Sequence, residues 1–165
     1  MSPLRRWLGL SPHPDGSKEE LSEQMTGGLD SLKHARYLEA FASVLARVAY
    51  VDREISSEES KVMMQIIERV DDVSPNDAQL IVAIAQESAR RMEREAGREA
   101  TLLFGTFATR SQRLSLLRCL FAVAAAHDGV SRIELEEIER IGRELGLSVA
   151  DVSTCRLELG ESPRR

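Results

Sequence analysis

The chain has 165 residues, the length of one ordinary domain with a continuous hydrophobic core. Apolar residues make up 42% and charged residues 30%, which is typical of a globular protein and excludes a disordered or fibrous one. The formal net charge is −5, whereas nucleic-acid-binding proteins normally carry a basic surplus, so no nucleic-acid partner is expected. No stretch approaches the ~18 apolar residues of a membrane span, and two cysteines are too few for a disulfide framework. These features predict a cytoplasmic protein.

The N-terminal residues differ from the rest of the chain in composition. Residues 1–30 contain three of the five prolines and little periodic apolar content. We interpret them as a basic N-terminal segment followed by a flexible linker. One helical domain is then expected over residues 31–159, with a frayed tail at 160–165.

The first ten residues carry two arginines, a tryptophan and no acid. Leu4, Trp7 and Leu8 could enter a lipid interface while Arg5 and Arg6 meet anionic head groups. The segment therefore predicts weak peripheral contact with the inner membrane. The alternative interpretation is a terminus that frays or packs back on its own domain.

Apolar residues at three- and four-residue spacing predict helices along the remaining chain. Pro75 is the only proline between residues 15 and 162, so long helices are permitted. Seven helices are expected, over residues 31–50, 56–70, 75–95, 99–108, 111–127, 131–145 and 148–159. No segment has the pattern of a strand.

Several residues predict where these helices begin and end. Ser74 is expected to cap the third helix, with Pro75 at its first position, where no backbone donor is needed. Gly97 is expected just after that helix ends. Gly146 stands where the sixth helix would need a left-handed residue.

Two stretches of the sequence share one pattern, at residues 49–59 and 125–134. Each runs from the end of an apolar helix through an aspartate and a tight turn to a Ser-x-x-Glu helix start. A Ser-x-x-Asp start follows each of them further along the chain. The repeat predicts an all-α fold, a single multi-helical domain of about seven helices built from two related helical hairpins.

This pattern resembles the signature of the tellurite-resistance TerB-like family, which is also similar to the N-terminal region of DjlA-type membrane co-chaperones. The resemblance covers about residues 31–159, with Arg53 in place of the glycine expected in the first turn. It implies an all-helical fold, divalent-ion contacts by the repeated acids and a role in stress response at the membrane, without an established enzymatic activity. The matching residues are Ala49, Asp52, Ile55, Ser56 and Glu59 in the first copy, and Ala125, Asp128, Gly129, Ser131 and Glu134 in the second.

The repeated acids are the candidate metal ligands: Asp52, Glu59, Asp128 and Glu134. Converging carboxylates suit a hard divalent cation such as calcium or magnesium. The alternative is that both glutamates belong to capping boxes, in which they accept a hydrogen bond from the backbone of the capping serine. Capping leaves unexplained why both copies place an aspartate at a helix C-terminus, where the helix dipole disfavours it.

Helix direction decides whether the two acid pairs can form one site. Short connections favour antiparallel neighbours, so successive helices should alternate in direction. If residues 99–108 form a helix, both repeat turns lie at the same end of the domain. If those residues form an irregular crossover, the turns lie at opposite ends.

No pattern in the sequence indicates a catalytic site. Cys119 and Cys155 lie in apolar or amphipathic stretches and are expected to be core thiols, and His127 is expected at a helix end. We therefore predict that the protein is not an enzyme. The rival prediction is a metal-dependent hydrolase that uses the four repeated carboxylates.

The function expected from this reasoning is a non-catalytic accessory module in tellurite or envelope stress. It would act as an ion-responsive scaffold that binds a protein partner near the membrane. The alternative is a metal-independent interaction domain, similar to a co-chaperone, that binds a partner helix.

Overall fold

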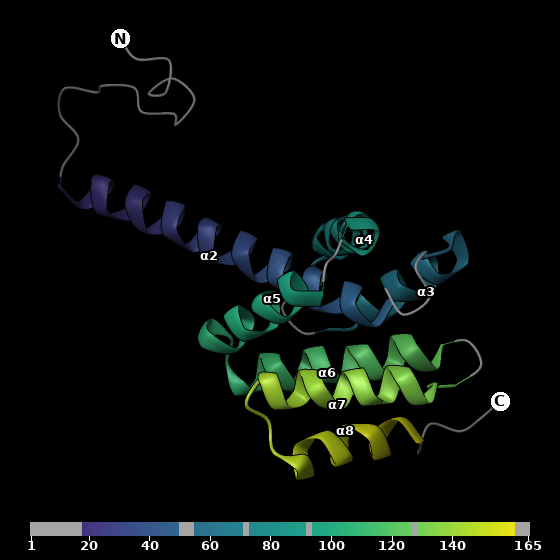
Figure 1. Cartoon of the computed structure of the whole chain (residues 1–165). Coiled ribbons are helices and arrows are strands. Elements are labelled where there is room, and N and C mark those ends of the chain that lie inside the picture. The colour runs from purple at the N-terminus through teal and green to yellow at the C-terminus, as the bar shows by residue number, and fades with distance from the viewer. Residues whose placement is uncertain (1–17, 50–54, 71–72, 92–93, 127–128, 161–165) are drawn as a thin grey trace. The chain divides into compact units, whose positions relative to one another are not determined.

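A computed structural model of the chain describes residues 18–49, 55–70, 73–91, 94–126 and 129–160. Seven helices and no strand lie within these residues, which confirms the predicted all-α class. The helices are α2 (Lys18–Ala49), α3 (Ser57–Ile67), α4 (Pro75–Arg91), α5 (Arg94–Phe107), α6 (Arg110–Ala125), α7 (Arg132–Glu144) and α8 (Val149–Gly160) (Figure 1).

The chain divides into two compact units, residues 1–35 and residues 36–165. In the first unit the described residues form the beginning of α2, so the prediction that this helix starts at Ser31 was wrong. Lys18–Met25 are mostly strong helix formers, and a helix tolerates Gly27 and Gly28 at a cost of about 1 kcal/mol each. The predicted membrane segment at residues 4–8 lies outside the described residues.

The second unit is organised around α6, which packs against α3, α7 and α8. Helices α6, α7 and α8 lie side by side (Figure 1), and α7 also contacts α5. Leu117 and Phe121, four residues apart, are fully buried on α6. From α2, Phe41 joins this core, and its ring meets Phe104 of α5 edge-on with 6.3 Å between the ring centroids.

The structure confirms most of the residues that were predicted to begin or end helices. Ser74 caps α4 by accepting a hydrogen bond from the backbone nitrogen of Asp77 at 3.1 Å, and Pro75 is the first helical residue. Gly146 follows α7 with φ +71°, in the left-handed region. The prediction for Gly97 was wrong, because this residue is buried inside α5. Its carbonyl accepts a hydrogen bond from the Thr101 hydroxyl at 2.9 Å.

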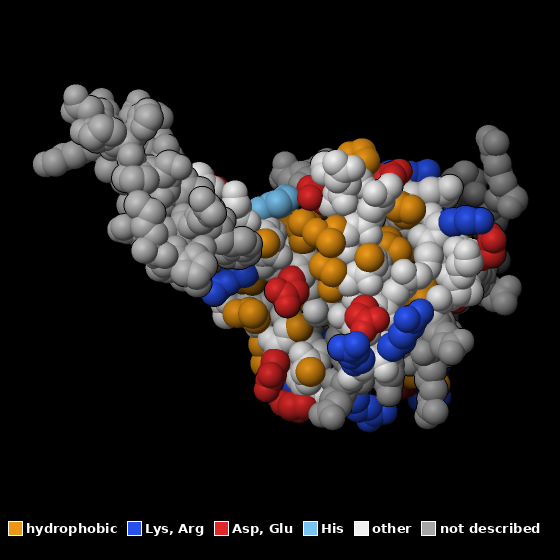
Figure 2. Space-filling model, turned by 90° about the horizontal axis from the view of Figure 1, so that it is seen from above, with side chains coloured by type: hydrophobic (Ala, Val, Ile, Leu, Met, Phe, Trp, Pro, Cys, Tyr) orange, Lys and Arg blue, Asp and Glu red, His pale blue; other side chains and the backbone are white. Residues whose placement is uncertain are grey.

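Some apolar residues that mark the helices in the sequence lie on the surface. They expose between 40% and 78% of their area: Leu80, Leu102, Leu103, Phe107, Ile133 and Val149. On the face shown in Figure 2, hydrophobic side chains accordingly lie among acidic and basic ones. The sides of α4 and α5 that face the core consist instead mainly of small residues, together with Ile81 and Phe104. Helical spacing alone does not distinguish Ile81 and Phe104 from the exposed apolar residues beside them.

Candidate functional site

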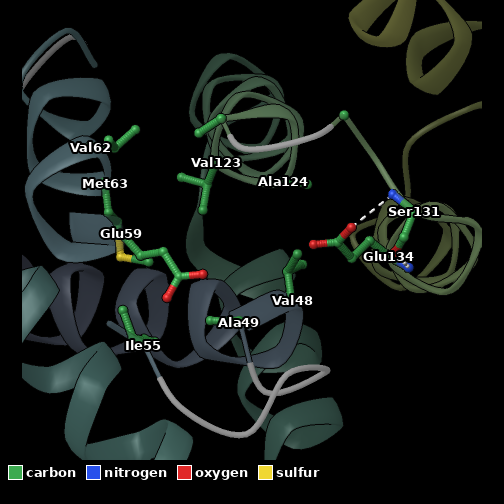
Figure 3. A pocket seen from close by; sticks show the side chains of 12 residues that line it. Val48, Ala49, Ile55, Glu59, Val62, Met63, Val123, Ala124, Ser131 and Glu134 are labelled. Atoms are coloured by element: carbon green, nitrogen blue, oxygen red, sulfur yellow. Dashed lines mark hydrogen bonds between the residues drawn. The ribbon is translucent and has the colours of Figure 1, made fainter. Parts of the chain in front are cut away.

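A pocket of about 260 Å³ opens where the helix starts of the two repeats meet the end of α2 (Figure 3). Helices α2, α3, α6 and α7 all contribute to its wall, so it depends on the packing of both hairpins. Its described lining residues are Val48, Ala49, Ile55, Glu59, Val62, Met63, Val123, Ala124, Ala126, Gly129, Ser131 and Glu134.

Glu59 and Glu134 take equivalent positions on the two sides of this pocket. Each is the third residue of its helix, and each completes a capping box. A carboxylate oxygen of Glu59 accepts from the backbone nitrogen of Ser56 at 2.6 Å, and one of Glu134 accepts from the backbone nitrogen of Ser131 at 2.8 Å. The capping role predicted for both glutamates is therefore present.

Both carboxylates of these capping glutamates also face the pocket. Figure 3 shows both pointing into the space between α3 and α7. The described lining contains no lysine, arginine or histidine, so the two half-buried glutamates make this pocket acidic.

The aspartates of the predicted acid pairs, Asp52 and Asp128, lie outside the described residues, and so does His127. Residues that follow the aspartates in sequence, Ile55 and Gly129, both line the pocket. The structure thus brings together the glutamates of both pairs, as the alternation of helix directions predicted, with α5 present as a helix. Among the described residues, no three His, Cys, Asp or Glu side chains are grouped so that they could hold a metal ion.

A buried charge that the sequence analysis missed comes next to a pocket residue in the sequence of α2. Arg47 directly precedes the pocket residue Val48 and is only 8% exposed. Its Nε donates to Glu137 at 2.9 Å, and one guanidinium nitrogen donates to the Thr101 hydroxyl at 2.6 Å and also to Glu144. The arginine thereby joins α2 to α5 and α7.

Neither cysteine has the properties of a nucleophile. Cys119 and Cys155 are free and buried, as predicted for core thiols. Burial raises the pKa of Cys119 to about 12, and it also raises the pKa of Cys155. Both thiols are therefore protonated at neutral pH, whereas nucleophilic attack needs the thiolate.

The fold and the pocket define a class: an all-helical protein with two related hairpins and an acidic pocket where their helix starts meet. The family model described as "Tellurite resistance protein TerB" matches residues 38–157. The chain belongs to this family, and the resemblance drawn from the repeat is confirmed. No curated protein and no solved structure matches the chain. No helix in the described part is both long and apolar enough to cross a membrane.

Proposed function

We propose that this protein is a non-catalytic accessory module whose acidic pocket binds a divalent cation. The observation that carries the proposal is that Glu59 and Glu134, from the two copies of the repeat, line one pocket. Two carboxylates that face a shared space repel each other, and a cation between them relieves the repulsion.

The available ligands favour calcium or magnesium over softer metals. Both ions prefer oxygen ligands, and calcium takes six to eight of them, including water. The described residues supply two carboxylates. Asp52 and Asp128, which precede the two helix starts in sequence, are the residues we propose to complete the set.

Isothermal titration with calcium, magnesium, manganese and zinc tests this proposal. Saturable binding by the full chain is expected, and it should be at least tenfold weaker in the Glu59→Gln/Glu134→Gln variant. Glutamine preserves the capping box, so the substitution removes charge without removing a helix start. The control is Glu58→Gln/Glu136→Gln, which makes the same charge change at exposed positions on α3 and α7.

Two results would contradict the ion proposal. If no metal binds, the metal-independent interaction domain becomes the better account. If metal binds equally well to both double variants, the ion sits elsewhere. Substitution of Asp52 and Asp128 by asparagine then tests whether these residues contribute to the site.

The non-catalytic part of the proposal is tested by screening phosphatase and esterase substrates with magnesium, manganese or zinc. No turnover above the metal-only background is expected. Robust turnover that Asp128→Ala abolishes would favour the metal-dependent hydrolase.

A role in tellurite or envelope stress near the membrane is proposed from the family and from the N-terminal segment. Trp7 is the only tryptophan in the chain, so its fluorescence reports on that segment alone. We expect a blue shift with vesicles that contain anionic phosphatidylglycerol and none with phosphatidylcholine alone. An unchanged spectrum with both vesicles would refute membrane contact by this segment.

A further inference from the structure

The first part of α2 has an apolar side that the described residues leave exposed. Leu29 and Leu32 expose 55% and 64% of their area, and residues 27–36 are all exposed. The two leucines are three residues apart, so they lie on one side of the helix. In the sequence, Leu21 and Met25 continue the same spacing toward the start of α2. A helix with such an apolar stripe gains free energy when another surface covers it.

Basic side chains accompany these leucines. Lys33 is one helical turn after Leu29 and Arg36 is two turns after it, so both lie beside the apolar side, and both are exposed. Lys33 pairs with Asp30 at 3.8 Å, but two groups as exposed as these attract each other only weakly. Asp30 itself lies about 100° round the helix from Leu29 and about 160° from Leu32. Residues 27–36 therefore carry leucines and basic groups on one side and their acid on another.

Most acids nearer the start of α2 follow the same pattern in the sequence. Glu19, Glu23 and Asp30 are four and seven residues apart, which assigns them to one side of the helix, away from the leucines. Glu20 alone departs from this spacing. Basic residues beside an apolar stripe are typical of helices on a membrane surface, because their stems stay in the apolar layer while their charges reach the head groups.

The charge on this side favours anionic lipid over a second copy of the chain. Two α2 helices joined through it would bring four basic groups, Lys33 and Arg36 from each copy, to one contact without an acid of residues 27–36 on the same side. Anionic head groups neutralise the same charges, and each lysine or arginine near such a surface strengthens binding.

We infer that residues 18–36 of α2 lie in the interface of an anionic membrane. The apolar side would face the acyl chains, Lys33 and Arg36 would meet the head groups, and the helix would lie in the membrane plane. This inference rests on the membrane role proposed above, which so far involves residues 4–8 only. A single short segment binds a membrane weakly and reversibly, so attachment needs a second element. The first part of α2, which follows that segment in sequence, supplies it.

Amide hydrogen exchange of the full chain tests the inference directly. With vesicles of phosphatidylglycerol and phosphatidylethanolamine, residues 27–35 should exchange at least tenfold more slowly than without vesicles, because a helix held in the interface opens less often. Exchange at Phe41 and Leu45 should not change, and vesicles of phosphatidylcholine alone should have no effect. Unchanged exchange of residues 27–35 with the anionic vesicles would overturn the inference.

A leucine variant tests the apolar side. Leu29→Gln/Leu32→Gln should weaken co-sedimentation with the anionic vesicles at least tenfold, because the apolar area that enters the lipid is lost. The control is Leu103→Gln/Leu157→Gln, which changes leucines on α5 and α8 that are about equally exposed, at 54% and 67%. This control should bind as the wild type does. Equal binding by the two double variants would overturn the inference, and circular dichroism checks that both remain folded.

A second variant tests the basic groups. Lys33→Gln/Arg36→Gln should also weaken binding to the anionic vesicles at least tenfold. Arg90→Gln/Arg91→Gln removes the same charge from exposed positions on α4 and should bind as the wild type does. The same loss in both variants would show that net charge alone governs binding, which would overturn the inference.

The inference and the proposed membrane contact of residues 4–8 can fail separately, because Trp7 fluorescence reports on that segment and amide exchange reports on α2. A Trp7 shift with unchanged exchange refutes the inference and leaves the contact of residues 4–8 standing. Slower exchange without a Trp7 shift supports the inference and refutes that contact. Protection of residues 27–35 that grows with protein concentration in the absence of vesicles would identify a second copy as the covering surface and overturn the inference.

Discussion

Arg47 shows how strongly a single residue can depend on its partners. Removing a guanidinium from water costs several kcal/mol, and among the described residues the two carboxylates of Glu137 and Glu144 and the Thr101 hydroxyl offset that cost. If one partner of such a buried group is deleted, the remaining charge is left in the interior. The arginine and the two glutamates therefore depend on one another for their burial.

Arg47→Met should lower the free energy of unfolding by about 3–5 kcal/mol, because Glu137 and Glu144 would be left facing an apolar side chain. Urea unfolding at pH 7 measures the loss. The control is Arg140→Met, which removes an exposed arginine that also pairs with Glu137 and should cost less than about 1 kcal/mol. Similar losses in the two variants would show that Arg47 is not specially stabilising.

Sequence patterns identify residues with local partners and miss those with distant ones. Ser56 and Ser131 could be predicted as helix caps because their partners are three residues away. The partners of Arg47 are 54, 90 and 97 residues away in the chain, and nothing in a single sequence links them. An arginine within a run as apolar as Val44–Val48 was the one available signal.

At the scale of the helices, close packing of α7 on α8 depends on Gly142. A Cβ atom at this position would lie 2.6 Å from a methyl carbon of Val152 on α8, well inside van der Waals contact. The glycine therefore sets how near the two helices can approach. Gly105 in α5 differs, because a Cβ there would meet its nearest neighbour at an ordinary 3.5 Å.

Gly142→Ala should destabilise the fold by about 1–3 kcal/mol through overpacking, as measured by urea unfolding. Adding Val152→Ala should recover part of that loss, because it removes the methyl group that clashes. Gly105→Ala is the matched control and should be neutral or slightly stabilising, since alanine is the better helix former. No recovery in the double variant would mean that the strain arises elsewhere.

The start of α8 makes stability depend on pH. The pKa of Asp151 is lowered, chiefly because the Ser148 backbone nitrogen and hydroxyl hydrogen-bond with it, and further by the Arg110 guanidinium. In the unfolded chain an aspartate titrates near its usual value of about 3.9. Its contribution is therefore complete above that pH and is lost as the pH falls toward the lowered pKa of the folded state.

Asp151→Asn should flatten the loss of stability below about pH 4, because the substituted residue no longer titrates. Thermal unfolding between pH 3 and pH 7 measures the slope. Asp30→Asn, at an exposed position away from any helix start, should keep the steeper acid dependence. Parallel curves for the wild type and Asp151→Asn would refute a contribution from this cap.

Over the whole molecule, the order of the helices could be predicted from the sequence. Which residues of each helix are buried could be predicted only in part. Alternating directions placed both repeat turns at one end, and Glu59 and Glu134 do line one pocket. The pocket walls could not be predicted, because Val48, Val62 and Val123 meet only once α2, α3 and α6 have packed together. The helical start of α2 was missed because Gly27 and Gly28 were interpreted as a flexible joint, although Leu21, Met25, Leu29 and Leu32 have helical spacing.

Exposure also predicts where the chain opens most readily. Residues 27–36 of α2 are all exposed, whereas Phe41 and Leu45 further along the same helix are fully buried. Amide hydrogen exchange in residues 27–35 should therefore be orders of magnitude faster than at Phe41 and Leu45. Uniform protection along α2 would contradict this and would indicate that another surface covers its first part in solution.

The Arg47 cluster also ties together the two halves of the duplication. A fragment of residues 1–93 would contain the arginine without its two carboxylates, and a fragment of residues 94–165 would contain the carboxylates without the arginine. Each fragment would therefore bury charged groups without their partners, so neither is expected to fold alone. Mixed together, the fragments should complement each other and regain helical circular dichroism that neither shows separately. The two related hairpins are therefore expected to fold only when both are present.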